Sequence, residues 1–200
     1  VLANLGVAVS VAGLTAMVKS AIDTGDALDE MSQRVGVSVE TLSVWKPAAE
    51  QSGVSGESFE KGLRKLSTTM LEAATGSEDA ARGFSAVGVE FKNQDGTLRA
   101  TDQVLLDLAE RFKAMPDGAE KTALAVQLFG KSGAELIPFL NQGRDGINEL
   151  AAEMQALGVQ MGSETAAQAG NFNDALDELK WATTSIGNQI IASVLPALND

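Results

Sequence analysis

The 200-residue chain contains no cysteine, no histidine and no tyrosine. Without cysteine it can form no disulfide, no thiolate nucleophile and none of the usual zinc sites. Without histidine it lacks the side chain that most often serves as a general base or metal ligand. Its carboxylates are scattered at helix-surface spacing, and aromatic residues that could line a sugar groove are few. We therefore expect no enzyme, no cofactor and no metal site.

Large and basic side chains are also scarce. Aromatic residues make up 4% of the chain, so any core should be thin and lined by Ala, Leu and Val, which suits closely packed helices. Lys and Arg number 15 against 27 Asp and Glu, giving a net charge of −12. This charge disfavours specific nucleic-acid binding, which needs clustered basic residues, and fits a self-repelling surface. The length allows one domain or two small ones.

The first 18 residues, VLANLGVAVSVAGLTAMV, carry no charged side chain. Two interpretations remain open for them: a buried, self-associating helix, or a segment that enters a lipid bilayer at some stage. No basic residues precede the run, so we expect no signal peptide, and the start at Val1 indicates a piece of a longer polypeptide. From Leu14 to Val35, apolar residues at intervals of three and four predict an amphipathic helix compatible with a coiled coil.

Three helices are predicted between residues 38 and 86. Ser38 should cap the first, which runs to about Gln51 and contains Pro47, a residue that predicts a kink or a late start. The second covers 57–74, and Ser77 opens the third. Trp45 is expected in the core rather than as a partner-binding anchor. The residues expected on the buried faces are Leu42, Trp45, Ala49, Phe59, Leu63, Leu66, Met70, Ala73, Ala81 and Phe84.

The stretch Val89–Arg99 has the strongest β pattern in the chain, because apolar and charged residues alternate before a turn sequence, Asn-Gln-Asp-Gly. A two-residue turn would place Lys92 opposite Arg99, two like charges. A four-residue loop instead places Phe91 opposite Leu98, so we prefer it. The loop lacks the ligand spacing of an EF-hand, and we expect no calcium there.

A helix capped by Thr101 and another that starts at Pro116 and ends at Phe129-Gly130 lead into the stretch Val126–Gly143, VQLFGKSGAELIPFLNQG, which begins with the end of the second helix. The glycines of this stretch should end one helix and let a short apolar segment, interrupted by Pro138, fold back so that two apolar faces meet. Gly-Lys-Ser is the ending of a phosphate-binding loop. However, the upstream glycine of that motif is missing, so we expect no nucleotide site.

Two more helices are predicted towards the end of the sequence. The first, residues 144–157, has an apolar face made by Ile147, Leu150, Ala151, Met154 and Leu157. The second runs from Glu164 to about Val194, with a three/four seam through Ala169, Phe172, Leu176, Leu179, Thr183, Ile186 and Ile190. Whether this seam packs on the chain's own helices or on further copies of the chain is left open.

Several blocks of the sequence, in their order and spacing, resemble phage tail tape measure proteins. The central block is LFGKSGAELIPFLNQG (128–143). Around it are AAEQSGVSGESFEKGLRKL (48–66), DGTLRATDQVLLDLAERF (95–112), MPDGAEKTALAVQLFG (115–130), FNDALDEL (172–179) and VLPALN (194–199). The resemblance covers most of residues 40–199 and identifies the chain as an internal fragment of such a protein.

The resemblance implies a structural protein that occupies the tail tube during assembly, sets tail length and leaves ahead of the DNA on infection. It implies a location in the virion, in the tail-tube lumen or tail tip, after synthesis in the bacterial cytoplasm. Expected partners are further copies of the chain, with a trimer favoured, tail tube and tail tip proteins, and transiently the host membrane. The alternatives are a membrane-active or pore-forming helical protein, or a helical adaptor that binds through Trp45 or Trp181.

We expect a mainly α, multi-helix fold, elongated or loosely packed, with coiled-coil-capable terminal helices and one β-hairpin at about residues 89–99. The expected domains are an apolar segment 1–37, a compact helical block 38–158 and a long C-terminal helix 159–200. The residues expected to make the structural contacts are Phe129, Gly130, Gly133, Leu136, Pro138, Leu140, Gly143, Phe172, Leu176, Leu179, Ile186 and Ile190.

Overall fold

The structure, a computed structural model, describes residues 11–171, 173 and 174, with side chains from residue 19 onward. This part of the chain is mainly helical, as expected. It divides into two compact units, which we describe separately. The central unit is Glu30–Gly162, and the terminal unit combines the residues before and after it, 1–29 and 163–200.

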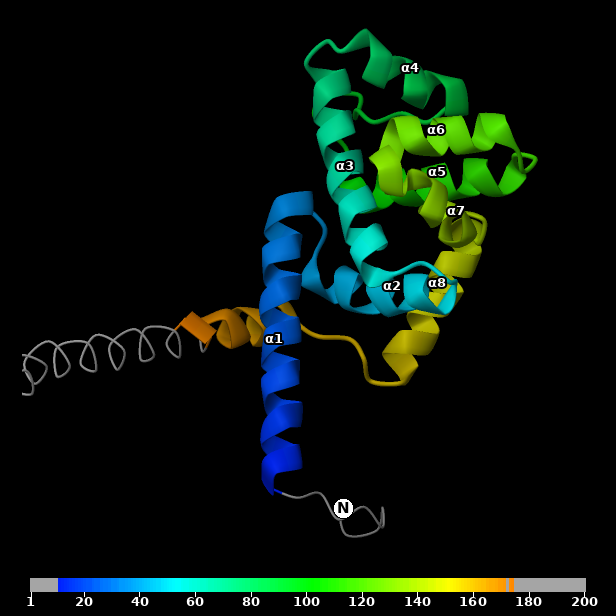
Figure 1. Cartoon of the computed structure of the whole chain (residues 1–200). Helices are drawn as coiled ribbons and strands as arrows, with labels where there is room; N and C mark the ends of the chain where they lie inside the picture. The colour runs from blue at the N-terminus through cyan, green and yellow to red at the C-terminus, as the bar shows by residue number, and fades with distance from the viewer. Residues whose placement is uncertain (1–10, 172, 175–200) are drawn as a thin grey trace, which may run out of the picture. The chain divides into compact units, whose positions relative to one another are not determined.

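Helix α1 is followed by the labelled helices α2 to α8 and one 3-10 turn (Figure 1). Their bounds are α1 Val11–Val35, α2 Val39–Gln51, α3 Gly56–Ala74, α4 Glu78–Val87, α5 Thr101–Ala114, α6 Ala119–Phe129, η2 Gly130–Ser132, α7 Gly133–Leu140 and α8 Gly143–Ala156. Helix α1 begins in the terminal unit and ends in the central unit, and residues 163–171 are also helical.

Serine side chains begin three successive helices of the central unit. Ser38, Ser55 and Ser77 each accept the backbone N–H of the residue three positions later, at 3.2, 3.1 and 3.3 Å. This satisfies one of the N–H groups that a helix start leaves without an internal partner. The expected caps at Ser38 and Ser77 are therefore present.

The expected starts of the next two helices are wrong. Thr101 is the first residue of α5 rather than its cap; the cap position is Ala100, which has no capping side chain. Thr101 is instead buried, 6% exposed. Helix α6 begins at Ala119, three residues after Pro116. Met115, which precedes the proline, is extended, as the proline ring requires of its neighbour.

Two prolines lie inside helices instead of interrupting them. Helix α2 starts at Val39 and continues through Pro47, so a late start is wrong, and α7 continues through Pro138. Burial of the apolar face of α2 offsets the lost hydrogen bond, since Leu42 and Ala48 have no exposed surface. In the same helix, Ser43 Oγ accepts the N–H of Met161 at 3.0 Å, which ties the last residues of the central unit to α2.

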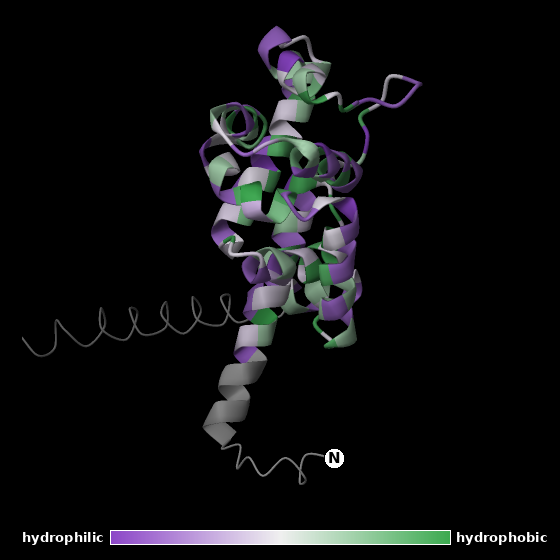
Figure 2. Cartoon of the chain, turned by 90° about the vertical axis from the view of Figure 1, so that its right-hand side faces the viewer, coloured by the Kyte–Doolittle hydropathy of each residue, from purple (hydrophilic) through white to green (hydrophobic). Residues whose placement is uncertain are grey.

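The core of the central unit is rich in aromatic side chains, although the chain has few. Five of its seven phenylalanines are fully buried. Phe59 meets Phe139 edge-on with ring centroids 5.4 Å apart, and Phe112 meets Phe129 at 6.3 Å. Trp45 is 4% exposed and belongs to this core, as expected. The helices of the central unit carry both hydrophilic and hydrophobic residues, as helices on the surface of a core do (Figure 2).

Most of the expected buried faces of α2, α3 and α4 are confirmed. Nine of the ten residues are buried: Leu42, Trp45, Ala49, Phe59, Leu63, Leu66, Met70, Ala73 and Phe84. The exception is Ala81, which is partly exposed, whereas its neighbour Ala80 is 6% exposed. The buried face of α4 is thus rotated by one residue from the expected one. A ten-residue helix contains few apolar residues, so its pattern defines the buried face less closely.

The expected β-hairpin is not present: no strand occurs in the described residues, and residues 89–99 form a loop with one antiparallel bridge, Lys92 to Leu98. The bridge also shows that both considered registers were off by one residue. The Arg99 side chain explains the difference, because it donates to the Glu90 carbonyl oxygen at 2.6 Å and to Asp107 at 2.7 Å. The side chain thus points to α5, while the Arg99 backbone N–H donates to the Phe91 carbonyl oxygen at 3.0 Å, in the same register as the bridge.

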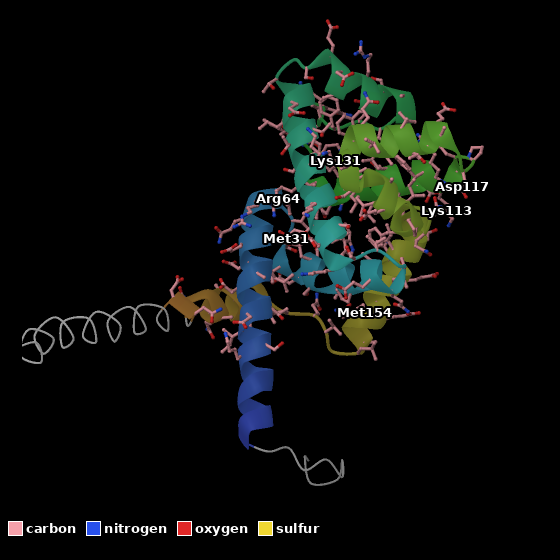
Figure 3. The ribbon with its side chains drawn as sticks, viewed as in Figure 1. Met31, Arg64, Lys113, Asp117, Lys131 and Met154 are labelled. Atoms are coloured by element: carbon pink, nitrogen blue, oxygen red, sulfur yellow. The ribbon has the colours of Figure 1, made fainter. Side chains whose placement is uncertain are left out.

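Helix α8 forms where expected, but its apolar face is only partly covered. Ile147 is fully buried, and Leu150, Ala151 and Met154 are partly exposed. Leu157, just beyond the helix end, is 74% exposed. The N-terminal half of α8 therefore belongs to the core, and the half that carries Met154 lies at its margin (Figure 3).

Candidate functional site

The stretch Val126–Gly143 forms a sharp corner, which we call the glycine corner, between α6 and α7. Helix α6 ends at Phe129, and Gly130 follows with φ +70°, a conformation that side chains other than glycine resist. The 3-10 turn Gly130–Ser132 then leads directly into α7. The glycines thus end one helix and return the chain for the next.

Gly133 lets the start of α7 lie against the backbone of α6. A Cβ atom at this position would lie 2.0 Å from the carbonyl oxygen of Ala125 and 2.4 Å from its carbonyl carbon. Both distances are far inside van der Waals contact, and the atoms belong to backbone that cannot rotate away. The corner can close in this form only with glycine at position 133.

Helix α7 packs on α3 through a second close approach. A Cβ on Gly62 of α3 would lie 2.2 Å from Cδ1 of Leu136, which is 2% exposed. One turn further along, Phe139 meets Phe59 of α3 edge-on, at an interplanar angle of 81°. The sequence pattern predicts the apolar face of α3, but it does not show that Leu136 of α7 packs against Gly62.

Seven of the expected site residues lie along this stretch, from the end of α6 through α7 to Gly143, the first residue of α8. Phe129, Leu136 and Leu140 are 1%, 2% and 0% exposed. Gly133 and Gly143 are buried, Gly130 is half-buried and Pro138 is exposed. The remaining five, Phe172, Leu176, Leu179, Ile186 and Ile190, lie outside the described residues. The seven are joined by packing and turn geometry, and none of them carries a group suited to acid, base or nucleophilic chemistry.

A buried lysine closes the turn between α5 and α6. Lys121 is 2% exposed, and its ammonium donates to the Met115 carbonyl oxygen at 3.1 Å and to Asp117 Oδ1 at 2.9 Å. Figure 3 shows Asp117 at this turn, near Lys113. The hydrogen bond from Lys121, then its positive charge, hold the pKa of the Asp117 carboxyl below its ordinary value. No pattern in the sequence distinguishes this lysine from the exposed ones.

Replacing Lys121 with methionine should lower the free energy of unfolding by about 1–3 kcal/mol, because the partly buried Met115 carbonyl loses its donor. Methionine keeps the apolar stem. The ion pair with Asp117 stabilises the fold above the ordinary carboxyl pKa of 3.8, and that contribution disappears as the pH falls through the lowered folded-state pKa. Urea unfolding at pH 7 and pH 3 should therefore show a smaller difference between the two proteins at pH 3. An equal difference at both values would contradict the ion-pair contribution.

A charged pocket of about 470 Å³ lies beside α5 and was not anticipated from the sequence. Its lining includes six charged side chains: Glu90, Arg99, Asp107, Glu110, Arg111 and Arg144. Asp107 is shared between two guanidinium groups, since both Arg99 and Arg144 donate to it. The backbone N–H of Arg144 donates to Glu110 Oε2 at 3.2 Å. These residues come from three separate segments, so only the fold assembles them.

Other kinds of site were not found within the described residues. They contain no group of three or more Asp or Glu side chains placed to hold a metal ion. Among the same residues, no helix is long and apolar enough to cross a bilayer. Most of the two segments on which the membrane-active alternative rests, 1–18 and 186–198, lies outside the described residues.

The comparisons with known proteins gave no match: no family model fits the chain, and neither the curated proteins nor the solved structures include a similar one.

Proposed function

We propose that this chain is a segment of a phage tail tape measure protein. The observation that carries the proposal is the block Leu128–Gly143, whose sequence resembles that family and whose residues form the glycine corner of the central unit. The role is structural rather than catalytic. It places the protein in the virion, within the tail tube or at its tip, with tail tube and tip proteins as partners.

The helical content of the described chain supports a role as a ruler. Each residue of an α-helix adds about 1.5 Å, so a helical rod converts residue number into distance. In the terminal unit, the described segments that precede and follow the central unit contact each other at Asp26. There, Asn173 donates to Asp26 at 3.1 Å, and the Cα of Gly170 lies so near that a Cβ would be 3.1 Å from Asp26.

The acidic surface is compatible with DNA passing through the same tube. At −12, the chain has too few basic residues to neutralise a phosphate backbone along its length. A protein that leaves the tube ahead of DNA benefits from such weak attraction. The few clustered arginines lie in one pocket rather than along a helix face.

The central unit adds a feature that a simple rod does not have. It contains a packed core and is inserted between two helical segments of the terminal unit. We hypothesise that it is a compact domain that lies outside the tube or at a tail end, or that it unravels to fit a narrow lumen.

The experiment is an in-frame insertion in the phage genome that encodes the chain, followed by electron microscopy of purified tails. The stretch Val11–Asp29 lies entirely within helix α1. Duplicating it should lengthen the tail by about 1.5 Å for each added residue. Unchanged tail length would contradict the ruler role. Absence of the chain from purified tails, tested with an antibody raised against it, would contradict the assignment to the tail.

A matched insertion of the same length in the exposed loop Asn93–Thr97 serves as control. It adds equal mass to the central unit without extending a rod. If the central unit stays compact, this variant keeps the parental tail length. If the unit unravels in the tube, the tail lengthens as in the first variant.

The oligomeric state can be measured on the same 200-residue chain. Light scattering combined with small-angle X-ray scattering should give a trimer of elongated shape if the terminal helices associate as a parallel seam. A monomer would contradict the expected self-association, and the ruler role would then have to rest on a single copy.

A further inference from the structure

Half of the arginines of this chain line one pocket. The sequence contains six arginines, and Arg99, Arg111 and Arg144 all line the pocket beside α5. The other three lie on α1, α3 and α4, where each pairs with an acid three or four residues away on its own helix. The pocket arginines differ because residues far apart in the sequence bring them together.

The pocket has more hydrogen-bond donors than the protein uses. Each guanidinium carries five N–H donors. Arg99 uses its side chain for Glu90 O and Asp107, and Arg144 uses its side chain for Asp107. Arg111 makes no side-chain hydrogen bond or ion pair within the described residues. Several donors from three planar guanidinium groups therefore remain available around a space of about 470 Å³.

The acids in the pocket are already engaged in part. Both carboxylate oxygens of Asp107 accept a guanidinium N–H, one from Arg99 and one from Arg144. Glu110 accepts the backbone N–H of Arg144, and Glu90 lies on the exposed loop. The three arginines and the three acids of the lining (Glu90, Asp107 and Glu110) balance to a net charge of zero. In a chain of net charge −12, this is a local exception.

A purely structural explanation accounts for only part of this arrangement. Arg111 lies in the last turn of α5, where a positive charge is favourable next to the helix carbonyl groups. Lys113 lies in the same turn and already provides such a charge. The helix end does not require that Arg111 border a pocket with two other arginines.

We propose that this pocket binds a small oxyanion of the carboxylate or phosphate class, with Arg111 as the principal donor. Guanidinium groups bind both classes through paired N–H···O bonds, as Asp107 does between Arg99 and Arg144. The volume lies within the range of small-molecule sites. This site is independent of the proposed role in the tail.

The test is a titration of the full 200-residue chain, labelled with ¹⁵N, with glutarate and separately with inorganic phosphate. Ionic strength is kept constant with chloride, so that general screening does not change. A saturable shift of the Nε–H signals of the pocket arginines, with a Kd below about 1 mM for one of the two anions, is expected. The anion that binds defines the class. Absence of saturable shifts with both anions would overturn the proposal.

Two arginine variants complete the test. Arg111→Gln should raise the Kd at least about tenfold, whereas Arg82→Gln, which removes an exposed arginine on α4, should leave it unchanged. Circular dichroism confirms that both variants are folded. If Arg111→Gln binds as tightly as the parent, or Arg82→Gln weakens binding equally, the anion is attracted by general charge and the proposed site is wrong.

Discussion

Replacing Gly133 with alanine should lower the free energy of unfolding by about 3 kcal/mol or more, the upper end of the cost of overpacking. The added Cβ would lie 2.0 Å from the Ala125 carbonyl oxygen, so α6 and α7 would have to move apart. Gly133 itself has helical torsion angles, φ −57° and ψ −40°, so the loss would come from the collision and not from backbone strain. Urea unfolding followed by circular dichroism measures the effect.

Gly146→Ala is the matched control for this variant. Gly146 also lies inside a helix, α8, and the nearest atom to a Cβ there is Cβ of the Gln142 side chain, at 3.0 Å. Alanine favours a helix by up to about 1 kcal/mol over glycine, which offsets this tight contact. If the two variants have the same stability, the close approach at Gly133 is not what holds the corner together.

Replacing Phe139 with alanine should cost about 3–5 kcal/mol, because the side chain is fully buried between α7 and α3. The change leaves a cavity and removes the edge-on contact with Phe59. A loss of this size is a large share of the total free energy of unfolding of a typical domain. We therefore also expect a strong fall in the midpoint temperature of thermal unfolding. Thermal and urea unfolding of the full chain measure it.

A double-mutant cycle separates the aromatic contact from the cavity. Phe59→Leu, Phe139→Leu and the double variant keep most of the buried volume, and their coupling energy should be about 0.5–1.5 kcal/mol. Additive effects would show that the two rings contribute only by burial. A loss below 1 kcal/mol for Phe139→Ala would contradict the assignment of α7 to the core.

The periodic helices could be predicted from the sequence because their signals are local. Helix α3 combines a serine at its start with apolar residues every three or four positions, and both features appear in the structure. Pro47 and Pro138 show where local signals fail. Each removes one hydrogen bond from its helix, but burial of the neighbouring apolar residues decides the conformation.

The loop at residues 89–99 could not be predicted because its conformation depends on a distant residue. Cross-strand preferences of some tenths of a kcal/mol favoured Phe91 opposite Leu98. The Arg99 side chain instead binds Asp107, eight residues away on α5, which in turn binds Arg144. Interactions of this kind are set by the packing of α5 and α8, so neither the register nor the charged pocket is visible in the local pattern.

The glycine corner could be predicted from the sequence only in part. Its glycines at 130 and 143 fit the expected turns, as positive φ angles of +70° at both positions show. The importance of Gly133 could not be read in the same way, since its torsion angles are those of any helical residue. Only the approach of the Ala125 carbonyl oxygen makes it necessary, and that distance exists only in the folded chain.

The hydrogen bond from the Met161 N–H to Ser43 Oγ has a mechanical consequence. It holds the exit of the central unit to α2, the helix that directly follows α1 in the chain. A force that separates the two ends of this unit would then act on neighbouring points and break interactions one after another, rather than shear many at once. If the chain is drawn along a narrow tube, as we propose, such a unit would resist tension weakly and would open from its ends.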